Sequence, residues 1–295
     1  MTMRKLALLF AGISTVISCS RIPEKESTTA QDARPVIEHL YSKSVADSFT
    51  VSISLPTGYR AREDKKYPVV YLLDGNLYFD IMATTLRKYS EVGLSPHVIL
   101  VGIGYKDFST MDSLRTRDDT YPVAIPEYEM STSGGAPKFL SFIARELIPY
   151  IDKNYHSNSS KRVLMGHSLG GYFTTFALLR TLEGERTGIQ GFIAASPSLH
   201  YNKYFLADKF KKLSLSSDTN PNLRVYVTYG GMEDSQDEPG SRGLKELTLD
   251  LSGVFDSGKH SRVQFKSDIF SNLDHMDTQL PTFIKGLQWV VTDKK

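Results

Sequence analysis

The sequence has a single cysteine, Cys19, among 295 residues, so no disulfide can form within one chain. It also lacks an excess of either charge, because 35 Lys and Arg residues stand against 33 Asp and Glu residues, for a net charge of +2. A protein that binds nucleic acid usually has a clear excess of Lys and Arg, so we expect no nucleic-acid partner. No internal repeat or linker interrupts the chain after the N-terminal region, which predicts one folded domain over residues 34–295.

Long hydrophobic runs are scarce as well. The most extended one, Leu6 to Ile17, follows two basic residues and is too short for a stable membrane span. It ends in Val-Ile-Ser-Cys, which resembles a bacterial lipoprotein signal, whose cysteine is acylated and becomes the first mature residue. The alternative is an ordinary secretory signal that happens to contain a cysteine.

The first interpretation makes residues 1–18 a signal peptide and Cys19 the site of lipid attachment. Residues 19–33 are polar and charged, and we expect them to form a flexible tether between the lipid and the domain. The protein would then be lipid-anchored in a bacterial cell envelope, at the outer membrane or facing the periplasm.

A G-x-S-x-G pattern, Gly-His-Ser-Leu-Gly at residues 166–170, lies between a short apolar strand pattern at 162–165 and a helical pattern. A strand–turn–helix of this kind holds its serine in a strained turn with the hydroxyl exposed, and the flanking glycines leave room for it. The pattern predicts Ser168 as a nucleophile and the N–H of Leu169 as an oxyanion donor at a helix N-terminus. The alternative is a chance match in a turn rich in Gly and Ser.

Strand patterns alternate with helical patterns along the rest of the domain. A half-buried strand is expected at 49–55, buried strands at 67–73, 97–104, 191–195 and 222–229, an edge strand at 262–266, and helices at 139–148, 244–251 and 283–290. Residues 105–137 show little periodicity and are expected to form a long loop. This order predicts an α/β fold with a mostly parallel sheet and helices on both faces.

A serine hydroxyl needs a base to take its proton, and in α/β-hydrolases the chain order is serine, acid, histidine. His275 follows the last predicted strand, which makes it the candidate base rather than a surface histidine. His167 lies inside the serine turn and is expected to support it. Glu233 and Asp234 follow the strand at 222–229; adjacent residues rarely point the same way, so we expect Glu233 to orient the imidazole and keep Asp234 as the alternative.

A second oxyanion donor is expected in the turn Asp74-Gly75-Asn76, directly after a buried strand. Its candidate is the N–H of Asn76, with Gly75 giving the backbone room. The same three residues also suit an ordinary tight turn, and both interpretations can hold together.

Together these residues resemble the putative-esterase family of the α/β-hydrolase superfamily, over about Phe49 to Trp289. The strings that carry the likeness are YPVVYLLDGNLYF, VGIGY, RTRDDTYP, FLSFIARELIPYID, GHSLGG and the final Asp-His pair at 274–275. Within the family the chain is most similar to the branch of siderophore (enterobactin-type) esterases, some of which work with a Ser–His dyad.

The resemblance implies an α/β-hydrolase fold and a substrate-binding role for Arg115 and Arg117, because arginine forks suit oxygen-rich anions such as ferric catecholates. The alternative is a structural arginine that pairs with Asp118 or Asp119 to hold the long loop.

The expected function is a serine esterase that acts through an acyl-enzyme on a small-molecule ester of the siderophore trilactone type. It would need no metal and no organic cofactor. Three alternatives remain open: a feruloyl or acetyl-xylan type carbohydrate esterase, an acyltransferase in which an alcohol replaces water, and a catalytically inactive surface module that binds a ligand on the same fold.

Overall fold

The structure is a computed structural model that describes residues 34–60, 64–214, 222–234, 240–255 and 262–292. The chain divides into two units, Met1–Asp32 and Ala33–Lys295, and the described residues all belong to the second. The predicted signal peptide, Cys19 and the tether therefore lie outside the described residues. None of the helices within these ranges is long and apolar enough to cross a membrane.

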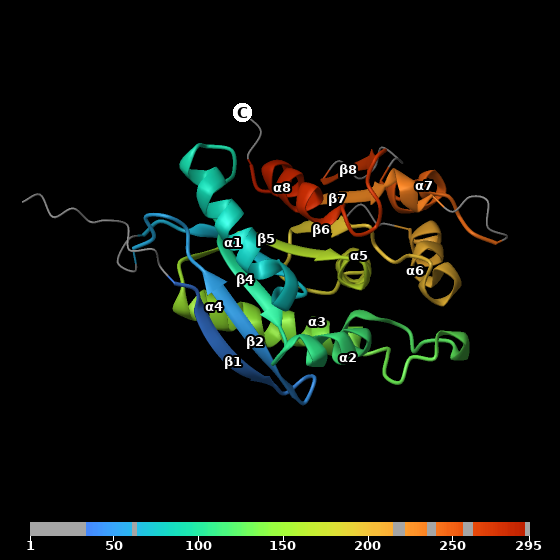
Figure 1. The fold of residues 1–295 in the computed structure, drawn as a ribbon, viewed down its shortest axis with the longest axis horizontal. Coiled ribbons are helices and arrows are strands. Elements are labelled where there is room, and N and C mark those ends of the chain that lie inside the picture. Colours follow the sequence, from blue (N-terminus) through green and yellow to red (C-terminus); the bar gives the residue numbers. More distant parts are fainter. Residues whose placement is uncertain (1–33, 61–63, 215–221, 235–239, 256–261, 293–295) are drawn as a thin grey trace, which may run out of the picture. The chain divides into compact units, whose positions relative to one another are not determined.

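An eight-stranded sheet forms the centre of the second unit (Figure 1). Its spatial order is β1-β2-β4-β3-β5-β6-β7-β8. The first two strands are antiparallel to their neighbours, and all the others pair in parallel. The bounds are β1 Val36–Ser42, β2 Asp47–Ser54, β3 Tyr67–Leu72, β4 Ile99–Gly104, β5 Ser157–His167, β6 Gly191–Ala195, β7 Leu223–Gly230 and β8 Val263–Phe270.

Helices cover both faces of this sheet. One face carries α1 (Gly75–Glu91) and α8 (Gln279–Val290), whose buried side chains share a core with those of the strands. The other face carries the remaining helices: α2 Phe108–Asp119, α3 Ala136–Phe142, α4 Ile148–Asn154, α5 Leu169–Leu182, α6 Tyr201–Lys212 and α7 Leu244–Ser252. A π-helical turn, Ile143–Leu147, joins α3 to α4.

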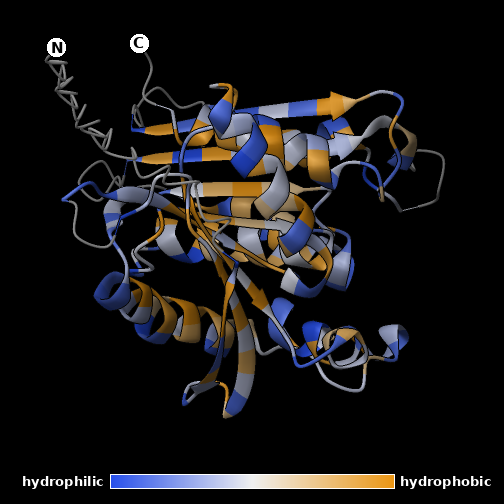
Figure 2. Cartoon of the chain, turned by 60° about the vertical axis from the view of Figure 1, so that its left-hand side comes forward, coloured by the Kyte–Doolittle hydropathy of each residue, from blue (hydrophilic) through white to orange (hydrophobic). Residues whose placement is uncertain are grey.

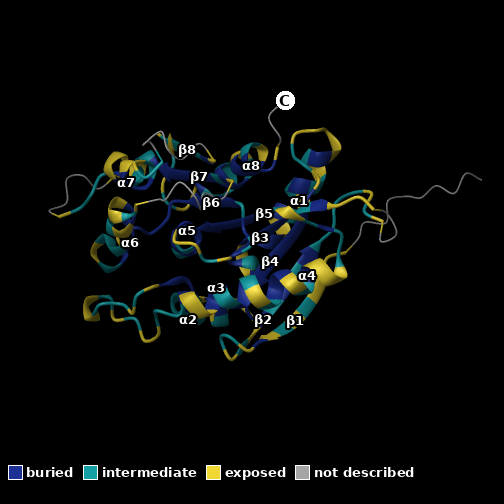
Figure 3. Cartoon of the chain, turned by 180° about the vertical axis from the view of Figure 1, so that it is seen from behind, coloured by how far each residue is buried: buried dark blue, intermediate teal, exposed yellow. Residues whose placement is uncertain are grey.

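The burial of each strand follows from its place in the sheet. β4, β6 and β7 are covered on both faces and read as nearly continuous apolar runs, whereas β2 alternates buried and half-buried residues. Successive side chains of β7 accordingly enter opposite cores, with Val225 and Val227 on one face and Tyr226 on the other. The central strands appear hydrophobic in Figure 2 and buried in Figure 3.

Most of the expected elements are present, but the long loop expected at 105–137 is wrong in part. It contains α2, and a short 3-10 turn follows at Pro126–Tyr128. The α2 helix has no apolar stripe, because polar side chains make up much of its buried side. The carboxylates of Asp118 and Asp119 are almost fully buried. The edge strand β1 was not expected either, and its largely exposed residues explain why its pattern is weak.

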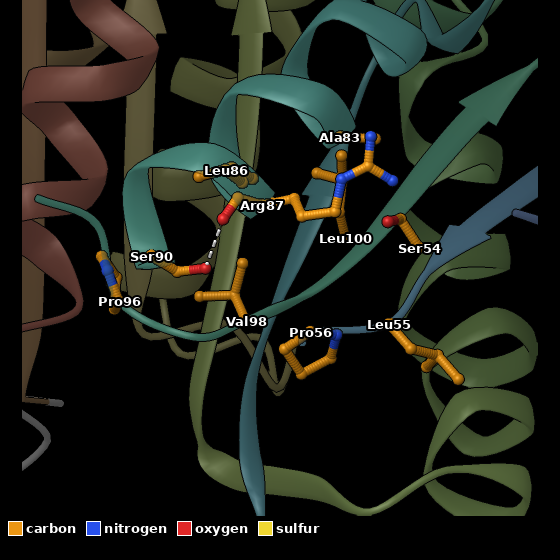
Figure 4. Close-up of a pocket in the computed structure, with 10 residues that line it drawn as sticks. All are labelled: Ser54, Leu55, Pro56, Ala83, Leu86, Arg87, Ser90, Pro96, Val98 and Leu100. Atoms are coloured by element: carbon orange, nitrogen blue, oxygen red, sulfur yellow. Dashed lines mark hydrogen bonds between the residues drawn. The ribbon is translucent and has the colours of Figure 1, made fainter. Parts of the chain in front are cut away.

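A shallow pocket lies at the edge of the sheet where the parallel strands begin (Figure 4). It is lined by residues near the end of β2, the C-terminal half of α1 and the start of β4. Its cavity volume is about 10 Å³, close to that of a single water probe, so the pocket is not a credible ligand site. The other edge, where the parallel strands end, is where α/β sheets bind ligands.

Candidate active site

A sharp turn at Ser168 joins β5 to α5. Ser168 has φ 58° and ψ −118°, a strained conformation for a residue with a side chain. The strain is possible because a Cβ at Gly166 would lie 2.4 Å from the carbonyl oxygen of Gly170, so only glycine fits there. At Gly171 a Cβ would come within 2.9 Å of the carbonyl oxygen of Ala195. The missing side chain at this position therefore lets α5 pack close to β6. The expected strand–turn–helix is therefore confirmed as local structure.

Two loops bring an imidazole and a carboxylate to this turn. His275 Nε2 lies 2.9 Å from Ser168 Oγ, and His275 Nδ1 lies 2.7 Å from Glu233 Oε2. His275 follows β8, and Glu233 ends a 3-10 turn, Gly231–Glu233, directly after β7. The carboxylate can only accept, so Nδ1–H donates to it, which leaves Nε2 to accept the serine proton. The histidine side chain is 37% exposed and that of the glutamate only 14%.

Glu233 is held as a carboxylate by three donors. Besides the bond from His275, its Oε1 accepts hydrogen bonds from Ser196 Oγ and from the N–H of Gly230, each at 2.6 Å. Burial alone would raise the pKa of Glu233, but the bonds from His275, Ser196 and Gly230 outweigh it and hold this pKa below its ordinary value. The acid therefore stays charged beside the imidazole at neutral pH.

The alternative acid, Asp234, points elsewhere. Its Oδ1 accepts a hydrogen bond from the N–H of Leu244 at 3.1 Å, at the start of α7. Asp274, next to the histidine, accepts from the N–H of Met276 at 2.8 Å in an exposed turn. Of the nearby carboxylates considered from the sequence, Glu233 is the one that the structure places on the imidazole.

The two candidate oxyanion donors both lie in the first turn of a helix. Leu169 is the first residue of α5 and Asn76 the second of α1, and N–H groups at such positions have no acceptor within their own helix. The side chain of Asn76 is bonded to the backbone of Tyr105, accepting from its N–H at 2.7 Å and donating to its carbonyl at 3.0 Å. The side chain of Asn76 is thereby fixed to the chain after β4, and the role of its main-chain N–H as an oxyanion donor stays a prediction.

The two arginines are engaged with carboxylates. Arg115 forms a two-pronged pair with Asp74 at 2.9 and 2.8 Å, and Asp74 has φ 51° at the N-terminus of α1. Arg117 bonds both oxygens of Asp118 at 2.9 Å and reaches Asp47 at 2.8 Å. Arg117 thus adopts the structural pairing kept open above, and Arg115 supports the turn before Asn76. A substrate contact by either stays a prediction.

A buried histidine anchors the loop that carries His275. His167 Nε2 lies 2.7 Å from the carbonyl oxygen of His275, and its Nδ1 lies 3.0 Å from Tyr78 Oη. Burial lowers the pKa of His167 to about 4, so the ring is neutral near pH 7; Nε2–H then donates to His275 and Nδ1 accepts from Tyr78. The sequence indicated a supporting role for His167 but gave no sign of its partner in α1.

Two serines after β6 were not expected to take part. Ser196 Oγ bonds both Glu233 and, at 2.7 Å, Thr278 Oγ1, while Ser198 Oγ lies 3.3 Å from Ser168 Oγ. The Ser-Pro-Ser turn after a buried strand was the only available signal for them.

Within the described ranges no group of three or more His, Cys, Asp or Glu side chains is arranged to hold a metal ion.

Comparison with known proteins places the chain in a family. A family model described as "Putative esterase" matches residues 42–275, which include Ser168, Glu233 and His275. The chain belongs to the putative-esterase family. This membership identifies it as an esterase-type hydrolase and confirms the resemblance found in the sequence.

Individual relatives agree with this. The ferri-bacillibactin esterase BesA of Bacillus subtilis is 34% identical over 204 residues, which cover 65% of this chain and 69% of the relative. Among solved structures, the BES protein from Bacillus cereus matches with a TM-score of 0.75 at 24% identity, covering 98% of this chain and all of the other. An IroE-like serine hydrolase from Shewanella oneidensis matches with a TM-score of 0.67 at 26% identity, covering 86% and 79%. The esterase therefore has the α/β-hydrolase fold.

The buried His167 should make the esterase sensitive to mild acid. Its pKa is lower in the folded state than the ordinary 6.5, so the unfolded chain binds more protons and stability falls as pH drops from 6.5 towards 4. From pH 7 to pH 5 this residue should remove about 2 kcal/mol from the free energy of unfolding. Urea denaturation at pH 7 and pH 5 measures this free energy. It should fall less between the two pH values in His167→Gln than in the parent protein.

The exposed His97 offers a matched control. His97→Gln should lose as much stability between the two pH values as the parent, because this change leaves His167 and its two hydrogen bonds in place. Equal losses in the parent and the His167→Gln protein would contradict the neutral, hydrogen-bonded state assigned to His167.

Proposed function

We propose that this esterase is a serine carboxylic-ester hydrolase that works through an acyl-enzyme. The observation that carries the proposal is the continuous contact from Ser168 Oγ through His275 to Glu233, at 2.9 and 2.7 Å. Both distances lie within hydrogen-bond reach, the geometric requirement for a nucleophile, its base and the group that orients the base.

In the proposed mechanism Ser168 Oγ attacks the ester carbonyl carbon as its proton passes to His275 Nε2. Glu233 stabilises the imidazolium that forms and keeps the ring in the correct tautomer. The N–H groups of Leu169 and Asn76 would stabilise the oxyanion of the tetrahedral intermediate, aided by the positive ends of two helix dipoles.

When the intermediate collapses, the ester C–O bond breaks and the leaving alcohol takes the proton from His275. Water then attacks the acyl-enzyme, with His275 again accepting a proton, and releases the acid and free Ser168. The carboxylate at Glu233 is suited to this cycle because its lowered pKa keeps it charged while the neighbouring imidazole changes its charge.

The proposed substrates are siderophore-type trilactone esters. Support comes from the relatives, because one is named a ferri-bacillibactin esterase and another an enterobactin esterase. Acylation at Cys19, inferred from the sequence pattern, would place the enzyme at the cell envelope, where ferric siderophores enter a bacterium.

A substrate panel tests both parts of the proposal. The enzyme should cleave a ferric trilactone siderophore far faster than feruloylated or acetylated sugars, and liquid chromatography of the linear products gives each rate. Ser168→Ala should lose all of these activities because it removes the hydroxyl that contacts His275 Nε2, while its melting temperature stays close to that of the parent. Full activity in Ser168→Ala would contradict the mechanism, whereas faster cleavage of sugar esters would contradict the substrate class.

The choice of acid can be tested with two isosteric changes. Glu233→Gln removes the charge that stabilises the imidazolium and should lower kcat by at least about a hundredfold. Asp234→Asn is the matched control, since Asp234 bonds the start of α7 instead, and its kcat should stay within about threefold of the parent. A near-normal rate in Glu233→Gln would indicate a Ser–His dyad, and the opposite order of effects would make Asp234 the acid.

A further inference from the structure

The connections that lead into β3, β4 and β5 meet at the edge of the sheet opposite the proposed active site. They are brought together because β3 pairs in parallel with both β4 and β5. The N–H of His156 donates to the hydroxyl of Tyr59 at 3.1 Å, and a shallow pocket joins the connection before β3 to the one before β4 (Figure 4). We call this surface the basal edge; its residues are 55–60, 64–66, 87–98 and 155–161.

Positive charge gathers on the basal edge. It contains six basic residues against two acidic ones, although the whole chain has 35 against 33. The acidic residues are Asp64 and Glu91, and Glu91 lies 3.4 Å from Lys88. The excess of positive charge is therefore local, and it suits an anionic partner. The basic residues are Arg60, Lys65, Lys66, Arg87, Lys88 and Lys161.

Two aliphatic side chains project from the basal edge. Val92 is 69% exposed and Leu94 is 54% exposed, in the turn after α1. This turn is held against α8, because Gln288 Nε2 donates to the carbonyl of Leu94 at 2.6 Å. Single exposed aliphatic residues are common on protein surfaces. A pair of them beside a cluster of lysines, however, supplies both components of binding to a lipid interface, which are apolar area to bury and positive charge for anionic headgroups.

The chain also enters the described domain beside the basal edge. β1 starts at Val36, which pairs with Ile53 close to the end of β2, and β2 ends next to the start of the antiparallel β4. Fourteen residues separate Arg34 from Cys19. A fully extended chain of that length spans at most about 50 Å. A lipid on Cys19, as proposed above, would therefore tether the domain by this edge and not by the edge that carries Ser168.

We propose that the basal edge binds the surface of an anionic phospholipid membrane, with its lysines near the headgroup phosphates and with Val92 and Leu94 among the headgroups. This binding requires neither the esterase activity nor a lipid on Cys19, although such a lipid would strengthen it by adding a second membrane contact. In the bound orientation Ser168 and His275 lie at the edge that faces away from the membrane, so a water-soluble ester reaches them while the protein stays bound.

Vesicle binding by residues 33–295 tests the proposal. This part of the chain forms a compact unit of its own, with the whole sheet and both hydrophobic cores. It should bind phosphatidylcholine vesicles that contain about 30% phosphatidylglycerol at least about tenfold more tightly than pure phosphatidylcholine vesicles. About 0.5 M NaCl should remove this difference by screening the charges. Reversing three charges together, with Lys65→Glu, Lys66→Glu and Lys88→Glu, should abolish it. Co-sedimentation gives the dissociation constants, and urea unfolding checks that each variant is folded.

The matched control reverses three exposed lysines that follow the ends of β4, β6 and β7, with Lys106→Glu, Lys203→Glu and Lys245→Glu. It changes the net charge equally and should keep most of the preference for phosphatidylglycerol. Equal binding of the parent domain to both kinds of vesicle, an undiminished preference in the basal-edge variant, or an equal loss in the control would each overturn the proposal. No step of this test depends on catalysis, so an inactive enzyme would contradict the proposed function and leave the membrane surface unaffected.

Discussion

The hydrogen bond between His275 and Ser168 is the contact on which the rest of this site depends. Together with the bond to Glu233, it requires that the loops after β5, β7 and β8 meet around the imidazole ring of His275. The parallel order β5-β6-β7-β8 makes this possible, because those strands all end at the same edge of the sheet. The strained turn at Ser168 then lifts its hydroxyl above that edge, and the glycines around it let the chain pass so closely.

Buried polar contacts hold those loops in place. The carboxylate of Glu233 is fixed by Ser196 and by the N–H of Gly230, and the main chain of His275 is fixed by His167, which is itself held by Tyr78. Each of these groups is paired, which a low-dielectric site requires. The side chains of the proposed triad are thus positioned by two separate elements, α1 through His167 and the turn after β6 through Ser196.

Much of this arrangement was predictable from the sequence, since Ser168, Glu233 and His275 each follow a recognisable strand and the structure brings them together. The supporting contacts were not, because a pair such as Tyr78 and His167 is 89 residues apart and carries no local pattern. The helix α2 was missed for a different reason: it is anchored by buried charge, and apolar periodicity cannot reveal such a helix. Arg115 and Arg117 belong to that same charged layer, where Asp74, Asp47 and Asp118 occupy their forks.

The most direct test of the account is covalent labelling with a fluorophosphonate, followed by mass spectrometry of the labelled peptide. A serine is phosphonylated by such a probe only when a base activates it beside an oxyanion site. The account predicts a single adduct on Ser168 in the parent protein and a strong loss of labelling in His275→Ala. An unlabelled protein, or an adduct on the neighbouring Ser198, would contradict it.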